Sequence, residues 1–367
     1  MKLRIALIIP TMDRGGAEKQ LALLAENLPR EEFDVRVFLL TRDGPRSESL
    51  RQAGIPVTVI GKRFKADPTA LFRLRRALAD WAPDLVHTWL FAANSFGRAA
   101  ALLAKVPVIV ASERCVDPWK AWWHFRIDRF LARRSAAITT NSSGVQEFYG
   151  RHGIDPDLFH LIPNGIPPRA VTPISRRQAF ERLGVSVERK LVLAVGRLWP
   201  QKRYRDLIWA AELLACTRDD TTLVVIGDGP QKAELLRFRD SVTIPEHVRF
   251  VGARDDVAEL LPHADLFWIG SEYEGQSNAV IEAMQAGIPV IASDIPGNRD
   301  LILDDQTGRL VPLGDRAALA RESLDLLEHP EVADRLGTAA RERIQDAFSV
   351  ETMVQRHAQL YRDLVSR

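Results

Sequence analysis

The stretch that decides the fold is Ser271–Asp300, SEYEGQSNAVIEAMQAGIPVIASDIPGNRD. Its first residues, 271–276, are polar and include a glycine, which predicts a loop. A helix is expected over 278–286, ended by Gly287, and a short apolar strand over 288–292. Because a loop that enters a helix presents backbone N–H groups and the positive end of the helix dipole, this arrangement favours binding of an anion such as phosphate.

Two carboxylates accompany the predicted anion site. Glu274 precedes the helix, and Glu282 lies about one turn inside it, eight positions later. A carboxylate close to a phosphate site is well placed to accept hydrogen bonds from sugar hydroxyls. An ordinary helix with an acidic first turn is the alternative.

Composition limits the class of protein. The 367 residues are enough for two domains, 46% of them are hydrophobic, and the net charge is only +2, so no overall field points to nucleic acid. Cys115 and Cys216 show no metal-ligand spacing. The apolar N-terminus is interpreted as a strand, and no apolar run approaches the about 18 residues of a membrane span, so a cytoplasmic protein is expected.

Strands alternate with helices on both sides of the linker expected at 163–177, where prolines, Gly165 and polar residues gather. Alternation of this kind predicts parallel, doubly wound sheets with helices on both faces. The sequence therefore predicts an α/β protein with two Rossmann-like domains, 1–168 and 169–349, facing across a cleft. A last helix is expected over 350–365, in a C-terminal segment that ends at residue 367.

One basic and aromatic segment stands out in the first half. Residues 119–134, WKAWWHFRIDRFLARR, combine three tryptophans and two phenylalanines with four arginines. Such a segment can lie on an anionic membrane surface, with its aromatic rings inserted and its arginines on the headgroups. The alternative is a helix whose aromatic rings pack on its own domain while the arginines stay in water.

Cations follow the first strand of the second domain. In the segment 196–203, GRLWPQKR, Arg197 and Lys202 lie between a strand and a helix. Two cations at the end of a parallel strand could neutralise a departing pyrophosphate, although they could also be surface cations at a turn. Val251 ends a later strand of the same domain, and its backbone could hold a nucleobase.

These segments resemble the retaining family 4 glycosyltransferases of the GT-B fold. The resemblance rests on motifs that follow the family's order along nearly the whole chain: GGAE at 15–18, PDLVH at 83–87, NSSG at 141–144, IPNGI at 162–166, GRLWPQKRYRDLI at 196–208, GDGP at 227–230, FVG at 250–252, and EGQSNAVIEAMQAGIPVIAS at 274–293, with Glu274 and Glu282 eight positions apart.

The resemblance implies a nucleotide-sugar donor bound mainly in the second domain. It implies that Arg197 and Lys202 hold the diphosphate and that Glu282 holds the ribose hydroxyls. Glu274 would lie beside the transferred sugar, surrounded by the amides of Gly275, Gln276, Ser277 and Asn278, and Gly16 would approach the donor phosphate from the first domain. Such enzymes need no metal or other cofactor, and their last helix returns to the first domain, which suits residues 350–365.

The sequence departs from the family at one position. Many members carry His-x-His where this chain has His87, Thr88 and Trp89, so only His87 matches as a catalytic candidate. Glu113 and Arg114, at the end of the next strand, are candidates for the acceptor side. We expect a sugar transferase acting on a lipid-linked or cell-envelope glycan, peripheral on the inner face of the cytoplasmic membrane. The alternatives are a nucleotide-sugar epimerase of the same fold and a non-catalytic nucleotide-sugar-binding subunit.

Overall fold

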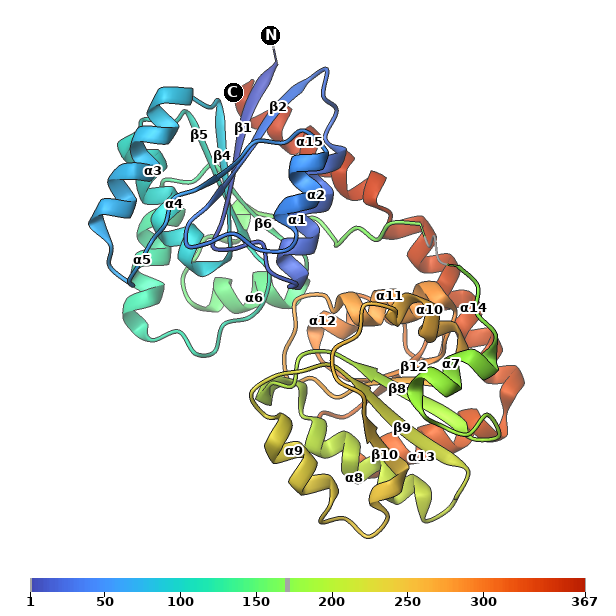
Figure 1. Cartoon of the computed structure of the whole chain (residues 1–367). Coiled ribbons are helices and arrows are strands. Elements are labelled where there is room, and N and C mark those ends of the chain that lie inside the picture. The colour runs from blue at the N-terminus through green and yellow to red at the C-terminus, as the bar shows by residue number, and fades with distance from the viewer. Residues whose placement is uncertain (1, 169–171, 367) are drawn as a thin grey trace. The chain divides into compact units, whose positions relative to one another are not determined.

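The computed structural model describes residues 2–168 and 172–366 (Figure 1). The chain divides into two compact units: unit 1 comprises Met1–Gly165 and Phe348–Arg367, and unit 2 comprises Ile166–Ala347. Each unit contains one parallel sheet covered by helices, which confirms the predicted fold class. Of the predicted linker, residues 169–171 lie outside the described part, and from Arg176 onward the chain is already helical.

Unit 1 is built on a sheet of seven strands in the order β3-β2-β1-β4-β5-β6-β7. The strands are β1 (Leu3–Ile9), β2 (Phe33–Leu39), β3 (Val57–Val59), β4 (Leu85–Trp89), β5 (Val108–Glu113), β6 (Ala137–Thr140) and β7 (Phe159–Leu161). The helices are α1 (Gly16–Asn27), α2 (Ser47–Gln52), α3 (Pro68–Trp81), α4 (Leu90–Leu103), α5 (Trp122–Ala132), α6 (Ser143–Arg151) and the C-terminal α15 (Val350–Val365), with a short 3-10 turn at Pro156–Leu158.

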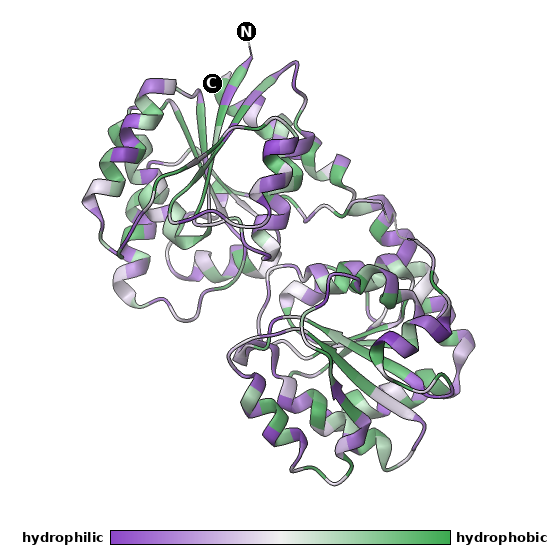
Figure 2. Ribbon diagram, in the orientation of Figure 1, coloured by the Kyte–Doolittle hydropathy of each residue, from purple (hydrophilic) through white to green (hydrophobic). Residues whose placement is uncertain are grey.

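The side chains of β1 alternate between two cores. Ile5, Leu7 and Ile9 belong to the core that α1 and α15 cover, whereas Ala6 and Ile8 belong to the core under α3 and α4. Because successive residues of a strand point to opposite faces, an entirely apolar strand requires helices on both faces of its sheet. In Figure 2 the central strands of both units are accordingly green, while the helices carry purple on their outward sides.

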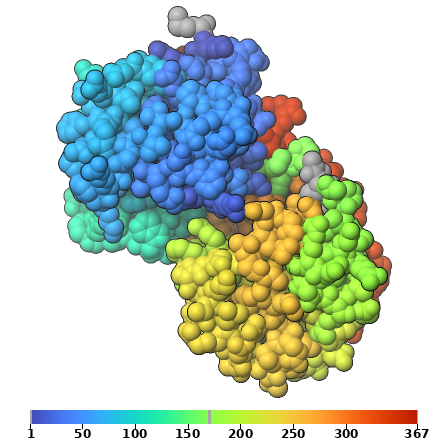
Figure 3. Space-filling view, viewed as in Figure 1, coloured from blue at the N-terminus to red at the C-terminus, as the bar shows by residue number. Residues whose placement is uncertain are grey.

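The C-terminal helix α15 packs against α1 in unit 1, as predicted (Figure 1). Its buried side chains join Leu21 and Leu24 of α1 and Leu28 directly after it, and they are Val350, Met353, Val354, Ala358, Leu360, Tyr361 and Leu364. Ser349 begins the helix, because its hydroxyl accepts a hydrogen bond from the N–H of Thr352 at 3.0 Å. In the space-filling view, atoms of this red helix adjoin the blue N-terminal segments (Figure 3).

Unit 2 is built on a sheet of six strands in the order β10-β9-β8-β11-β12-β13. The strands are β8 (Lys190–Val195), β9 (Thr221–Ile226), β10 (Val248–Phe250), β11 (Leu266–Ile269), β12 (Val290–Ser293) and β13 (Arg309–Val311). The helices are α7 (Arg176–Leu183), α8 (Tyr204–Ala215), α9 (Lys232–Arg239), α10 (Val257–Leu260), α11 (Asn278–Ala286), α12 (Pro296–Arg299), α13 (Arg316–Glu328) and α14 (Pro330–Ala347), and 3-10 turns lie at Pro200–Lys202, Pro245–His247 and Leu261–His263.

The decisive stretch folds as predicted, with a small shift in its strand. Helix α11 has the expected bounds, Asn278–Ala286, and Gly287 ends it in the left-handed conformation at φ 76°. Strand β12 begins at Val290, two residues later than expected, because the chain needs Ile288 and Pro289 to turn from the helix into the sheet. The loop before α11 therefore lies at the carboxyl end of β11, at the edge where parallel sheets bind ligands.

Candidate active site

The loops that follow β8, β9 and β10 are held together by their backbones. A Cβ on Gly227 would lie 1.9 Å from the carbonyl oxygen of Gly196, so only glycine allows the loops after β8 and β9 to approach this closely. The N–H of Gly227 donates to the carbonyl of Gly252 at 2.8 Å. The motifs that contain Gly196, Gly227 and Gly252 thus lie next to one another at one edge of the sheet. Val251 lies at the same edge, and its N–H donates to the Val225 carbonyl of β9 at 3.1 Å.

Lys202 and Glu274 form an ion pair at this edge. The Lys202 ammonium donates to Glu274 Oε1, and the two side chains are only 16% and 10% exposed. The hydroxyl of Ser271 donates to the same oxygen at 2.8 Å. Tyr204 lies next to them, its buried hydroxyl donating to the Gly196 carbonyl at 3.0 Å; burial raises the pKa of this phenol, and the charge of Glu274 raises it further.

The loop that carries Glu274 is fastened from two sides. The N–H of Glu272 donates to the Gln201 carbonyl at 2.8 Å, which joins this loop to the one after β8. From β12, the Ser293 hydroxyl donates to the Ser271 carbonyl at 2.6 Å. Asn298 of α12 in turn donates to the Ser293 carbonyl at 2.8 Å, so α12 supports the end of β12 that holds the loop.

Helix α11 begins directly after this loop. Ser277 is its N-cap and is buried, but its side chain makes no capping hydrogen bond, so the first N–H groups of the helix are not used by that hydroxyl. Gly275 and Gln276 are buried before it, Asn278 is the first helical residue, and Glu282 is half-buried on the helix. The predicted donor-binding residues of this segment therefore gather around one helix N-terminus.

Arg197 is exposed, unlike Lys202 and Glu274, which were predicted to lie in the same site. Its guanidinium lies 5.6 Å from the ring centre of Trp199, whose side chain is 47% exposed. In residues 2–168 and 172–366, no hydrogen bond or ion pair to the Arg197 guanidinium is found. The structure thus brings Lys202 and Glu274 together, and it places Arg197 on the same loop with its charge available to a ligand.

In unit 1, His87 lies in the core. It is completely buried, and its Nδ1 and Nε2 lie 2.7 Å from the Tyr361 hydroxyl and 3.1 Å from the Thr139 hydroxyl. Burial, with the charges of His357 and Arg114, lowers its pKa well below the usual value, so the ring is neutral. The ring thus links β4 to β6 and α15, and the catalytic role of His87 stays a prediction.

Trp89, which replaces the family's second histidine, is also buried. It stacks on His357 at 6.2 Å between ring centres, and the guanidinium of Arg114 lies 4.8 Å from its ring. Arg114 donates in addition to the side-chain oxygen of Asn164, and burial lowers its pKa to about 9. The acceptor-side role predicted for Arg114 finds no support in this position, because the guanidinium is enclosed by the protein.

Glu113 is likewise buried, in a cluster of charges below α5. Its Oε1 accepts from Asn94 at 2.9 Å, and its Oε2 lies 4.0 Å from the ammonium of Lys120. Burial raises the pKa of Glu113 to about 7, although Lys120 opposes the shift. A role at the acceptor is therefore not supported for Glu113 either. Neither burial was readable from the sequence, because the strand itself does not show whether other segments cover its end.

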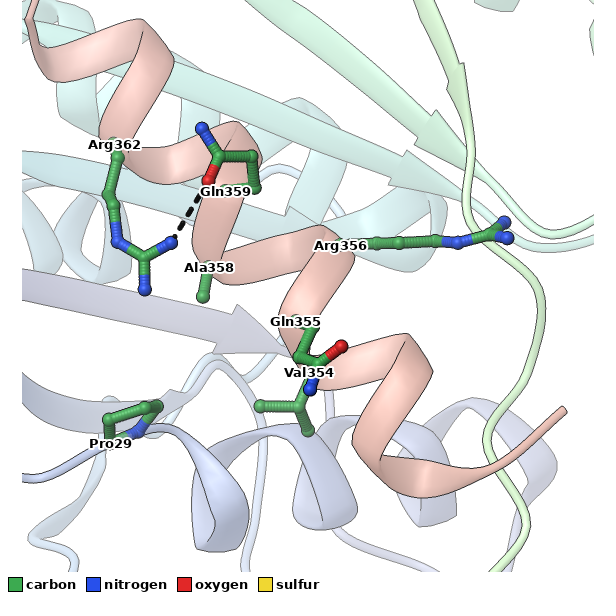
Figure 4. A pocket seen from close by; sticks show the side chains of 7 residues that line it. All are labelled: Pro29, Val354, Gln355, Arg356, Ala358, Gln359 and Arg362. Carbon is green, nitrogen blue, oxygen red and sulfur yellow. Dashed lines mark hydrogen bonds between the residues drawn. The ribbon is translucent and has the colours of Figure 1, made fainter. Parts of the chain in front are cut away.

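Gly16 is the first residue of α1, directly after the N-cap Gly15. Its predicted role at the donor phosphate stays a prediction. A shallow groove of about 400 Å³ lies elsewhere in unit 1, along α15, and none of the predicted site residues lines it (Figure 4). Its lining residues are Pro29, Val354, Gln355, Arg356, Ala358, Gln359 and Arg362.

In the parts of the chain that the structure describes, no group of three or more histidine, cysteine, aspartate or glutamate side chains is arranged to hold a metal ion. None of the helices described there has the length and apolar character that crossing a membrane requires. Tyr204 and Ser271 are the site residues that the sequence did not suggest; only their positions within or next to the motifs could have indicated them.

The geometry is that of a GT-B glycosyltransferase, and comparisons with known proteins agree. The model of the family "Glycosyl transferases group 1" matches residues 175–343, and that of the "Glycosyl transferase 4-like domain" matches residues 15–165. The putative glycosyltransferase EpsD of Bacillus subtilis is 30% identical, over 80% of this chain and 81% of its own. The chain therefore belongs to the group 1 glycosyl transferases and is a glycosyltransferase.

Two further proteins are similar over nearly their whole length. The Escherichia coli "UDP-Gal:alpha-D-GlcNAc-diphosphoundecaprenol alpha-1,3-galactosyltransferase" is 27% identical, over 93% of this chain and 92% of its own. The crystal structure of Anabaena Alr3699/HepE in complex with UDP-glucose superposes with a TM-score of 0.88 at 24% identity, over 98% of this chain and 100% of that one. The second similarity is one of fold.

Proposed function

We propose that this glycosyltransferase is a retaining enzyme that moves a sugar from a nucleoside-diphosphate sugar to an acceptor hydroxyl. The observation that carries the proposal is the gathering of Lys202, Glu274 and the N-terminus of α11 at one edge of the unit 2 sheet. Two cations and a helix N-terminus suit a diphosphate, and a carboxylate beside them suits sugar hydroxyls.

In this proposal Lys202 and Arg197 stabilise the negative charge of the leaving diphosphate, which is the main catalytic contribution of the protein. Glu282 holds the ribose hydroxyls, Val251 contacts the base through its backbone, and Glu274 holds the transferred sugar. The amides of Gly275, Gln276, Ser277 and Asn278 surround that sugar. No metal is required, because the two cations and the N–H groups of α11 supply the positive charge.

The donor site is tested by nucleotide binding. A panel of UDP, GDP and ADP is measured by thermal shift and calorimetry without metal, beginning with UDP because the Anabaena neighbour is described with UDP-glucose. A ligand at 100 times its dissociation constant stabilises the native state by about 2.7 kcal/mol. Arg197→Ala should abolish the shift and Lys202→Ala should weaken it, whereas Arg237→Ala, an exposed arginine on α9, should preserve it. Binding at wild-type affinity in both site variants would refute the proposed donor site.

Retention is tested separately, from the product. Proton NMR of the first product formed distinguishes the anomers, and the same anomeric configuration in donor and product is expected. An inverted product would refute the retaining mechanism while leaving the donor site intact.

For the acceptor, we propose a lipid-linked or cell-envelope glycan, with the enzyme bound to the inner face of the cytoplasmic membrane through α5. The exposed side of α5 and the turn before it carries Trp119 at 56%, Trp122 at 69%, Trp123 at 47% and Phe130 at 54% exposure. The exposure of these four residues supports this proposal over the alternative that the aromatic rings pack on their own domain. The name of the Escherichia coli relative, which includes a diphosphoundecaprenol acceptor, supports the same proposal.

Charge favours a membrane that contains anionic lipid. Arg126, Arg129, Arg133 and Arg134 are exposed on or just after α5, while its one acidic residue, Asp128, is completely buried. Each basic side chain near an anionic bilayer contributes about 1 kcal/mol to binding. The helix therefore combines exposed aromatic rings with a positive surface and no exposed acidic residue.

Vesicle sedimentation tests this proposal. Binding is expected to vesicles of phosphatidylglycerol and phosphatidylcholine, to decrease with salt, and to be lost in Trp122→Ser/Trp123→Ser. Trp209→Ser, which alters an exposed tryptophan of unit 2, is the matched control. Absence of binding at low salt would refute the membrane surface without affecting the donor site.

A further inference from the structure

The ion pair of Lys202 and Glu274 joins two residues to which the proposed function assigns different parts of the donor. Lys202 is to hold the diphosphate and Glu274 the sugar. In the structure each already neutralises the other, with the Lys202 ammonium bonded to Glu274 Oε1. A diphosphate therefore cannot take the full charge of Lys202 unless this bond is given up.

We infer that the diphosphate breaks the ion pair by drawing Lys202 away from Glu274. The sugar of the intact donor then replaces Lys202 as the partner of the Glu274 carboxylate. The inference rests on the proposed function. When the ammonium moves to the phosphate oxygens, the Glu274 carboxylate keeps only the hydrogen bond from Ser271. Sugar hydroxyls can then donate to it, whereas a nucleoside diphosphate without sugar leaves it without that compensation.

Because the pair is partly buried, the loss of the partner of Glu274 costs free energy of binding. The two side chains are 16% and 10% exposed, so water can only partly replace a lost partner. A partly buried acceptor left unsatisfied costs free energy, and more so if it is charged. The freed carboxylate would also lie near the phosphate anion that has taken its partner. Both effects weaken binding of the sugar-free nucleotide relative to the nucleotide sugar.

The exchange must happen by side-chain rotation. The loop of Glu274 is fastened by the bonds of Glu272 to Gln201 and of Ser293 to Ser271. On its other side, a Cβ on Gly297 would lie 2.0 Å from the carbonyl oxygen of Gly275, so the backbones are in tight contact. Lysine, by contrast, has a flexible four-carbon side chain whose compact charge can move between neighbouring anions.

One oxygen of Glu274 is already placed to receive a ligand. Both protein hydrogen bonds go to Oε1, and no bond to Oε2 is found among residues 2–168 and 172–366. Oε2 can therefore accept a first sugar hydroxyl while Oε1 still holds Lys202. The consequence is selectivity: the site prefers the nucleotide sugar to the nucleoside diphosphate that remains after transfer, which favours release of that product.

The test is calorimetry of UDP and UDP-glucose with the full chain, or of GDP and GDP-mannose if the panel above selects guanosine. Glu274→Gln keeps the size of the side chain but removes the charge that pairs with Lys202. We expect this variant to bind the sugar-free nucleotide about tenfold more tightly than the wild type does. The nucleotide sugar should gain much less or lose affinity, so the preference for it decreases.

A double-mutant cycle separates pairing from simple charge repulsion. In a Lys202→Ala background the gain from Glu274→Gln should disappear, because no ion pair is left to open. Glu272→Gln removes an exposed charge from the same loop and is the matched control, expected to change neither affinity. An equal gain in both backgrounds, or no gain in the wild-type background, would overturn the exchange. If the folded wild type binds none of these nucleotides, the proposed function is refuted and this inference with it.

Discussion

Lys120 provides a stringent test of the energetics of unit 1. Its side chain is completely buried, and its ammonium lies 2.9 Å from Asp128, 3.3 Å from Asp117 and 4.0 Å from Glu113. It also donates to the Tyr149 hydroxyl at 2.7 Å. Burial alone would lower the pKa of Lys120, but the three carboxylates outweigh it and raise the pKa. The lysine is thus charged and holds three acidic groups together.

Lys120→Met keeps much of the side-chain volume and removes the charge. Removing one partner of a buried ion pair costs about 3 to 5 kcal/mol, since the remaining charges lose their compensation. For a unit of this size we expect the melting temperature to fall by about 6 to 20 °C. Lys232→Met, which breaks the exposed pair with Asp228, should cost less than about 0.5 kcal/mol and is the matched control.

The pH dependence gives the test a second readout. The pKa of Glu113 is raised to about 7, above its unfolded value, so the native state binds the extra proton as the pH falls below 7. Without Lys120 this pKa rises further, because the neighbouring carboxylates are no longer neutralised. The stability deficit of Lys120→Met should therefore shrink between pH 8 and pH 6, as measured by urea unfolding. A deficit below about 1 kcal/mol at pH 8, or one that grows as the pH falls, would refute this account.

Three further outcomes are expected. Lys105 follows α4 with a left-handed φ of 56°, so Lys105→Gly should stabilise unit 1 by about 0.5 to 1 kcal/mol in urea unfolding, while Lys105→Ala gains nothing. Burial lowers the pKa of His357 to about 3, so below pH 6.5 only the unfolded state takes up a proton on this histidine. The free energy of unfolding of the wild type should therefore fall by about 1.4 kcal/mol per pH unit there relative to that of His357→Leu. Parallel pH profiles of the two proteins would contradict this. Sugar transfer should proceed unchanged in EDTA; a loss that magnesium restores would show that a metal is needed.

Local patterns in the sequence determined much of this protein. The bounds of α11 and α15 were readable because helical spacing, a following glycine and a preceding serine act within a few residues. The motif order likewise identified the family, and the alternation of apolar strands with helices predicted both sheets. These patterns lie within a few neighbouring residues, so they can be read without the tertiary structure.

Other elements were not predicted. Strand β13 has only three residues, Arg309–Val311, and exists because the edge of β12 pairs with it. Helix α7 begins at Arg176, within the last two residues of the predicted linker, and its local signals, the Ser175 cap and the Gly184 end, were overlooked. Strand pairing joins segments that are distant in sequence, and no pattern within either segment announces it.

The tertiary structure alone decided where the candidate site residues lie. His87, Glu113 and Arg114 are within or follow strands, as binding residues often do, yet all three are buried. Lys202 and Glu274 are 72 positions apart, and only the packing of two loops at the sheet edge brings them into one ion pair. Burial and long-range pairing depend on which segments meet in space, and those contacts form only in the folded chain.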